Sequence, residues 1–214
     1  MENGLIVLFG FTMLYFAATG RLVAHIRLLV WQGLLLFFIC CTAIGNLHPG
    51  SFVFLSLETL GVKAILIPWF LTRVLRKQSM LRDEAPGKPH FFSLLIASLI
   101  LLAGILSQNW IQSYPIISPI HFGVSVSSII ISLWLITVKH NVVSSIIGFI
   151  AMENGIFLLS LSIAKEMPLL VNAGVLFEVF LDIFILGIFV NLIHKEFKNL
   201  DVSGLSELKD SGND

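Results

Sequence analysis

The sequence has few charged residues, and this scarcity sets its class. Only 12% of its 214 residues are Asp, Glu, Lys or Arg, whereas 57% are hydrophobic. A water-soluble domain needs more charge than this, so the composition favours a membrane protein. The net charge is zero, and no overall field therefore directs the chain toward nucleic acid.

Patterns that bind metals or phosphate are also absent from the sequence. It has no His-x3-His or Cys-x2-Cys pair, no glycine-rich phosphate loop and no nucleophile elbow. Cys40 and Cys41 are adjacent, and neighbours on a helix point in different directions, so we expect both thiols to be inert. We therefore expect no cofactor or metal bound by this chain, and no complete catalytic centre of its own.

The apolar runs predict an all-α membrane protein with seven transmembrane helices. Charges, prolines and glycines separate runs of about 20 residues, the length that crosses a hydrocarbon layer. The predicted helices are residues 3–20, 26–46, 52–74, 91–108, 120–138, 142–164 and 169–193. The predicted organisation is a three-helix block (1–75), a cytoplasmic loop (76–90), a four-helix block (91–193) and a cytoplasmic tail (194–214).

Basic residues predict the orientation of these helices. All of the 13 Lys and Arg residues except Lys63 and Lys165 fall on one side of the seven-helix arrangement. Cytoplasmic loops of membrane proteins carry the excess of Lys and Arg. We therefore expect the amino terminus outside and the carboxyl terminus in the cytoplasm.

Four ionisable residues lie near the middle of predicted spans. Glu153 is in the sixth run, Glu178 and Asp182 are in the seventh, and Lys63 is in the third. An ionised group at the bilayer centre costs roughly 2.5–3.5 kcal/mol even on mild scales, and such groups often mark ion or proton paths. These four residues are the predicted proton path.

Each of these residues also has a structural interpretation. Glu153, followed by Asn154, could exchange a proton or could be a neutral carboxyl that joins two helices by hydrogen bonds. Glu178 and Asp182 are four residues apart and lie on one helix face, so they could share a proton. Asp182 is closer to the centre of its helix and is the preferred acid.

Lys63 needs a partner or a wet cavity inside the membrane. Glu58 is five residues away, which is about 140° around an α-helix, so it is a poor direct partner. We expect an acid from another helix, Asp182 or Glu153, to face Lys63. The alternatives are a switching proton store and a fixed ion pair that holds the helix in place, and Pro68 should kink this helix one turn later.

The carboxyl-terminal part resembles a known family. The run Lys139-His140-Asn141, residues 147–159 (IGFIAMENGIFLL) and residues 177–184 (FEVFLDIF) resemble the hydrogenase-4 component E family, as does the AILIP run after Lys63. Those proteins are membrane subunits of formate hydrogenlyase-type [NiFe] hydrogenase complexes. The same part is similar, more distantly, to the K subunit of respiratory complex I and the C subunit of multisubunit Na⁺/H⁺ antiporters.

The resemblance implies a location and partners. Glu153 takes the place of the first buried acid of the K subunit, and Asp182 or Glu178 takes the place of the second. It implies a multi-pass protein of the prokaryotic cytoplasmic (inner) membrane, beside antiporter-like subunits and peripheral hydrogenase subunits that carry nickel–iron and iron–sulfur clusters. The leading hypothesis is a subunit that contributes Glu153, Asp182, Glu178 and Lys63 to proton translocation, with Glu58, His140 and Asn154 secondary. The alternatives are a structural anchor that moves no ions and a subunit of a cation/proton antiporter.

Overall fold

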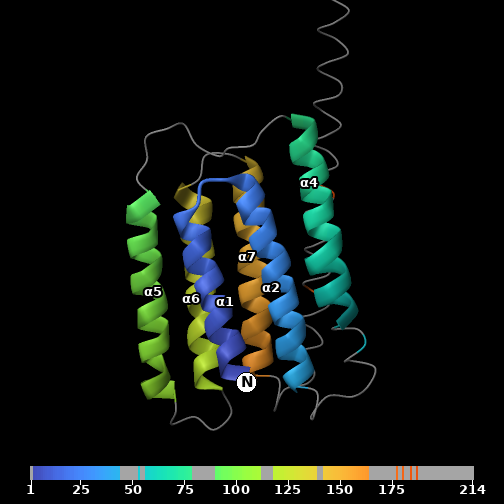
Figure 1. Cartoon of the computed structure of the whole chain (residues 1–214). Coiled ribbons are helices and arrows are strands. Elements are labelled where there is room, and N and C mark those ends of the chain that lie inside the picture. Colours follow the sequence, from blue (N-terminus) through green and yellow to red (C-terminus); the bar gives the residue numbers. More distant parts are fainter. Residues whose placement is uncertain are drawn as a thin grey trace, which may run out of the picture. The chain divides into compact units, whose positions relative to one another are not determined.

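The long apolar runs form helices. A computed structural model describes residues 2–43, 53, 56–78, 90–111, 118–138 and 142–163, and also residues 177, 180, 184 and 187 (Figure 1). Its elements are α1 (Glu2–Ala18), α2 (Leu22–Ala43), η2 (Leu57–Leu66), α4 (Ile67–Gln78), α5 (His90–Ile111), α6 (Pro119–Val138) and α7 (Val142–Ile163). All of these elements are helical, which confirms the predicted all-α class for the described residues.

Four of the helices are long and apolar enough to cross a membrane. These are α2, α5, α6 and α7, and α1 is a shorter apolar helix. The π-helical segment η2 continues directly into α4, so the third predicted run is also helical, although it extends to Gln78. The seventh run, 169–193, lies outside the described residues except for four helical positions. The protein is therefore a membrane protein, while the seven-helix count and the orientation stay predictions.

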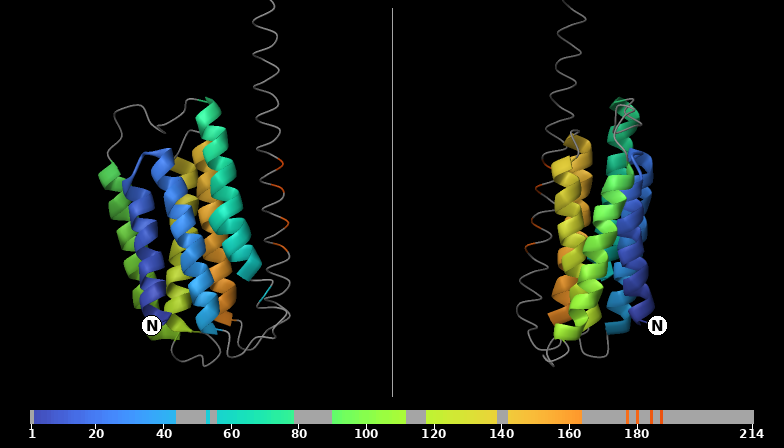
Figure 2. Two further views of the ribbon diagram at one scale, coloured as in Figure 1. Left: turned by 45° about the vertical axis from the view of Figure 1, so that its right-hand side comes forward. Right: turned by 90° about the vertical axis from the view of Figure 1, so that its left-hand side faces the viewer.

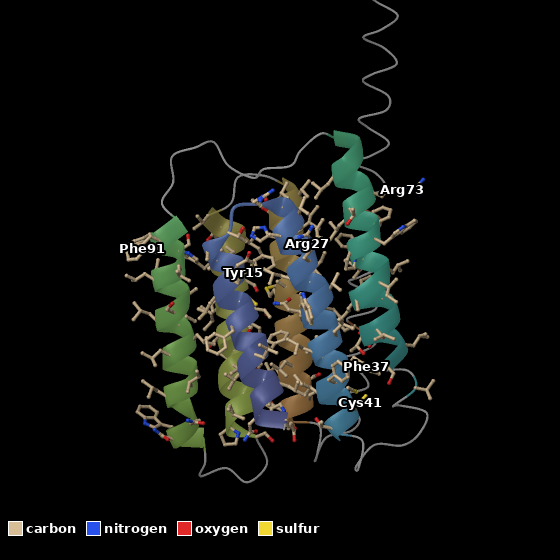
Figure 3. All side chains as sticks on the ribbon, viewed as in Figure 1. Tyr15, Arg27, Phe37, Cys41, Arg73 and Phe91 are labelled. Atoms are coloured by element: carbon tan, nitrogen blue, oxygen red, sulfur yellow. The ribbon has the colours of Figure 1, made fainter. Side chains whose placement is uncertain are left out.

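The helices α1 to α7 belong to one unit, Met1–Glu178. Consecutive helices run in opposite directions, as the views in Figures 1 and 2 show. α6 packs against α5, α7 and α1, and α2 packs against α1, α7, η2 and α4. Arg27 and Arg73 lie toward the same end of these helices (Figure 3), as the predicted sorting of basic residues requires.

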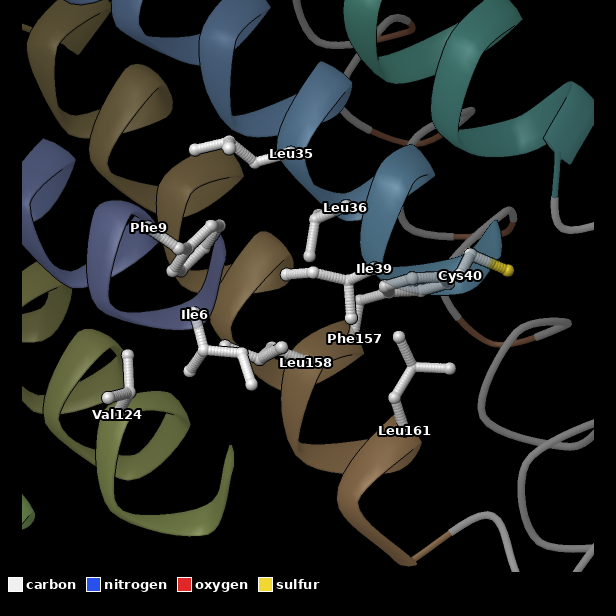
Figure 4. Packing of buried hydrophobic residues seen from close by; sticks show 10 residues of the cluster. All are labelled: Ile6, Phe9, Leu35, Leu36, Ile39, Cys40, Val124, Phe157, Leu158 and Leu161. Carbon is white, nitrogen blue, oxygen red and sulfur yellow. The ribbon is translucent and has the colours of Figure 1, made fainter. Parts of the chain in front are cut away.

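A hydrophobic core lies between α1, α2, α6 and α7 (Figure 4). Its members are apolar side chains that α1, α2 and α7 present at helical spacing, and α6 contributes one residue, Val124. They are Ile6, Phe9, Leu35, Leu36, Ile39, Cys40, Val124, Phe157, Leu158 and Leu161. Helices that enclose this core also bring the middle of α7 against α2, where the polar residues of the next section lie.

The opposite faces of the helices carry exposed apolar side chains. On α5, Leu95, Leu99, Leu102 and Leu106 recur at helical spacing and are exposed. Figure 3 shows such side chains projecting from α5 on the side away from the other helices. Surfaces of this kind suit hydrocarbon rather than water. Trp110 ends this face and is 86% exposed, as suits an aromatic residue at the membrane–water interface.

Glycines set the spacing between two of the helices. A Cβ atom added to Gly104 of α5 would overlap Ser127 Oγ and the carbonyl oxygen of Gly123, both on α6. The hydroxyl of Ser127 donates to the carbonyl oxygens of Gly123, at 2.8 Å, and of Ile100, at 3.1 Å. Small residues that let backbones approach, with hydroxyls bonded across the interface, are how membrane helices associate.

His25 fixes the short connection between α1 and α2. Its Nε2 atom lies 3.1 Å from the carbonyl oxygen of Phe16 and 2.9 Å from that of Thr19. Both partners are acceptors, so Nε2 carries the proton and donates. The ring also stacks on Phe16, with 4.4 Å between the ring centroids. The carbonyls at the end of α1 are thus satisfied by a buried side chain of α2.

Candidate functional site

The candidate site begins on the π-helical segment η2. Hydrogen bonds in a π-helix join residue i to i+5, and the backbone N–H of Ile67 accordingly donates to the carbonyl oxygen of Val62. The wider turn brings side chains five positions apart to nearly the same side. Glu58 and Lys63 are both buried, at 3% and 2% exposed. The α-helical geometry on which Glu58 was judged a poor partner of Lys63 therefore does not apply to this segment.

Lys63 reaches from η2 to α7. Its Nζ atom donates to Oδ1 of Asn154 at 3.3 Å and lies 5.1 Å from the centroid of the Phe157 ring. A cation over an aromatic face gains about 2 kcal/mol when it is shielded from water. Lys63 thus reaches α7. On α7, Lys63 donates to Asn154, the residue that follows Glu153. The expectation that an acid of another helix, Glu153 or Asp182, faces Lys63 stays a prediction.

Asn154 continues a line of hydrogen bonds through two more helices. Its Nδ2 atom donates to Oε1 of Gln32 on α2 at 3.0 Å. The Nε2 atom of Gln32 donates to Oγ1 of Thr12 on α1 at 3.0 Å and also contacts Sδ of Met13 at 3.0 Å. The hydroxyl of Thr12 donates to the carbonyl oxygen of Phe9 at 2.6 Å. We call Lys63, Asn154, Gln32 and Thr12 the polar chain.

Two buried acids flank the polar chain. Glu153 precedes Asn154 on α7 and is 1% exposed, and Glu58 lies on η2 with Lys63. Buried charges in proteins are compensated by pairing and hydrogen bonding. One lysine and two acids gathered among apolar helices can therefore hold and exchange protons without exposing charge to lipid.

Close contact between α2 and η2 makes this gathering possible. A Cβ atom added to Gly33 would lie 2.9 Å from the backbone nitrogen of Ala64 and 3.0 Å from its Cα. Gly33 follows Gln32, and Ala64 follows Lys63. The missing side chain at Gly33 thus lets η2 approach the helix that carries Gln32.

The structure brings together only part of the predicted set. Among the described residues, Lys63 of η2 contacts Asn154 of α7, and the buried acids Glu58 and Glu153 lie on these same two elements. Glu178, Asp182 and His140 lie outside the described residues, and their roles stay predictions. Pro68 lies just after the start of α4, where the π-helical winding ends.

Reasoning from the sequence missed Gln32 and Thr12. The signal for Gln32 was its amide within the apolar α2, where an uncharged polar group still needs hydrogen bonds. Thr12 gave no such signal, because a threonine in a membrane helix can satisfy its hydroxyl on its own backbone.

A contact between a histidine and an acid lies at one end of the helices. Nε2 of His121 on α6 is 3.1 Å from Oε1 of Glu2 on α1. His121 is buried, whereas the side chain of Glu2 is 43% exposed. A partly exposed pair of this kind contributes little to stability.

Comparisons with known proteins find distant similarity to bacterial proteins. The chain is 25% identical, over 189 residues, to the uncharacterized protein Rv0085 of Mycobacterium tuberculosis. This match covers 87% of this chain and 86% of that protein. It is also 25% identical, over 154 residues, to hydrogenase-4 component E of Escherichia coli (strain K12), with 69% of this chain and 68% of that protein covered. Hydrogenase-4 component E of Shigella flexneri gives the same values. No protein-family model and no solved structure matches the chain.

These comparisons support the predicted family at a distance. The similarity to hydrogenase-4 component E agrees with the resemblance read from the sequence, over about two thirds of the chain. The resemblance to the complex I K subunit stays a prediction. So do the absence of a bound cofactor and the absence of a catalytic centre.

Proposed function

We propose that this protein is a membrane subunit of a multisubunit complex related to hydrogenase-4. The similarity to hydrogenase-4 component E and the apolar helices support this proposal. Its location would be the prokaryotic cytoplasmic membrane. Antiporter-like membrane subunits would be its neighbours, and peripheral subunits with nickel–iron and iron–sulfur clusters would carry the redox chemistry.

Within such a complex, the role proposed for this chain is the lateral movement of protons. Lys63, Glu58 and Glu153 would form the part of the path that runs between η2 and α7. Asp182, with Glu178 as the alternative acid, would continue the path in the seventh predicted helix. His140, two residues before the start of α7, would be a secondary residue of the path.

One observation supports this role above the others. Lys63 is 2% exposed and hydrogen bonds to Asn154 of another helix, and Glu153 beside it is 1% exposed. Keeping these ionisable groups in an apolar interior is costly, and apolar residues of the same size would pack the helices at no such cost. Their retention is best explained by a need for exchangeable protons at this depth.

Purification from native membranes tests membership of a complex. A tagged chain extracted in mild detergent is expected to bring hydrogenase-type catalytic subunits with it. Recovery with antiporter subunits alone would contradict the hydrogenase assignment and support the antiporter alternative. A single chain free of any partner would contradict both.

A structural anchor is the second candidate function. The polar chain supports it, because hydrogen bonds join α1, α2, η2 and α7, which lie far apart in sequence. Substitution of Glu153 by Gln separates the two functions, since Gln keeps the shape and can hydrogen bond but has no acid proton. Normal assembly with impaired proton movement supports the path, and normal assembly with unimpaired movement supports the anchor.

A further inference from the structure

The polar chain has a fixed direction. Each of its members donates to the next: Lys63 Nζ to Asn154 Oδ1, Asn154 Nδ2 to Gln32 Oε1, and Gln32 Nε2 to Thr12 Oγ1. The hydroxyl of Thr12 donates its one hydrogen to the carbonyl oxygen of Phe9. Its oxygen can therefore only accept from Gln32. This orients the Gln32 amide, which in turn orients Asn154 with Oδ1 toward Lys63.

The chemistry of the chain excludes a proton path through it. A side-chain amide has a fixed carbonyl acceptor and a fixed NH₂ donor, and it does not titrate near neutral pH. The line also ends at a backbone carbonyl inside α1, where no titratable group receives a proton. A proton on Lys63 therefore cannot be transferred along Asn154, Gln32 and Thr12.

We infer that Gln32 and Thr12 are positioning residues that hold the Asn154 amide with its oxygen toward Lys63. The long lysine side chain is thereby kept between η2 and α7. Asn154 Oδ1 holds the ammonium group there together with the face of the Phe157 ring. The inference rests on the proposed role of Lys63 in proton movement, whereas the orientation of Asn154 is tested independently of that role.

The experiment compares matched variants of the complete complex. Gln32→Met keeps the side-chain length but removes the amide, and Thr12→Val keeps the shape but removes the hydroxyl. Thr12→Ser restores the hydroxyl and is the rescue variant. Thr42→Val is the control, because Thr42 makes the same local bond, to Ile39 at 2.7 Å, outside the polar chain. Proton movement is measured per assembled complex in proteoliposomes, beside Lys63→Met.

Gln32→Met is expected to lower the rate of proton movement about tenfold. This is the effect of losing one hydrogen bond in a line that leads to the charged Lys63. Thr12→Val is expected to lower it about threefold, because Met13 Sδ remains near the Gln32 amide as a weak acceptor. Thr12→Ser and Thr42→Val should match the parent. Adding Gln32→Met to Lys63→Met should have no further effect, since both act through the same lysine.

Two outcomes for the rate would overturn the inference. If Gln32→Met abolishes proton movement as completely as Lys63→Met does, the polar chain itself carries protons. If it only reduces the amount of assembled complex, with an unchanged rate per complex, Gln32 is structural and positions nothing.

A spectroscopic measurement tests the inference even if the proposed function is wrong. If Lys63→Met leaves the rate unchanged, Lys63 moves no protons, and the orientation of Asn154 decides the inference alone. Solid-state NMR on labelled protein in bilayers should show a cross-peak between Lys63 Nζ and the Asn154 side chain. The cross-peak should disappear in Gln32→Met and persist in Thr12→Ser. Its persistence in Gln32→Met would overturn the inference.

Discussion

Gly33 is where the contact between α2 and η2 can be tested most sharply. We expect Gly33→Ala to force these elements apart, because the new Cβ would lie 2.9 Å from the backbone nitrogen of Ala64 and 3.0 Å from both Cα and Cβ. Ordinary contacts of a Cβ atom begin at 3.4 Å. The obstacle is largely backbone, which cannot rotate away as a side chain can. The helices must therefore separate by about 0.4–0.5 Å, by comparison of these distances.

The expected magnitude follows from two opposing effects. Overpacking of a tight interface costs about 1–3 kcal/mol. Replacement of glycine by alanine within a helix gains up to about 1 kcal/mol from helix propensity. Gly61 supplies the control, since a Cβ there would meet only Leu57 Cδ1, at 3.7 Å. Relative to Gly61→Ala, Gly33→Ala should lower the free energy of unfolding by about 1–3 kcal/mol.

Denaturant unfolding of the purified protein in detergent measures both variants under the same conditions. Gly4→Ala is a second control, because nothing lies within 4 Å of a Cβ added at Gly4. Equal stability of Gly33→Ala and Gly61→Ala would refute the reasoning. The backbones of α2 and η2 would then be farther apart than the structure places them.

Two further substitutions test other packing features. Gly104→Ala should weaken the α5–α6 interface by about 1–3 kcal/mol, because its Cβ would overlap Ser127 Oγ; unfolding in detergent measures this, and stability equal to Gly4→Ala would contradict it. His25→Ala should lower the free energy of unfolding by about 1–3 kcal/mol by leaving carbonyls at the end of α1 without their donor. His25→Gln should recover part of that loss, and parent-like stability of His25→Ala would show that water replaces the ring.

The helices were largely predictable because their signal is local. Each of the first six predicted runs corresponds to a helix, with ends that differ by a few residues. The π-helical winding of η2 was not predictable. Nothing in the sequence from Glu58 to Lys63 distinguishes the i to i+5 hydrogen bonds of a π-helix from the i to i+4 bonds of an α-helix. This segment packs closely against α2, where Ala64 lies beside Gly33, a contact that the local sequence does not record.

The candidate site was predictable in its charges and not in its hydrogen bonds. Lys63 and Glu153 are conspicuous, because each interrupts an apolar run. Their connection depends on Asn154, which is 91 residues from Lys63 and 122 residues from Gln32 along the chain. No local pattern records contacts over such separations. An uncharged Gln within a membrane helix is nevertheless a usable signal, since its amide must find partners inside the protein.

The most direct test of the proposed function is proton movement by the Glu153→Gln complex. The variant is reconstituted into proteoliposomes beside the parent and Glu2→Gln, in which the same change is made to an acid that is 43% exposed at one end of the helices. The account predicts normal assembly of both variants, a parent-like rate for Glu2→Gln, and a rate at least about tenfold lower for Glu153→Gln, in the range that a lost proton-transfer group produces. A fully assembled Glu153→Gln complex that moves protons at the parent rate would contradict it.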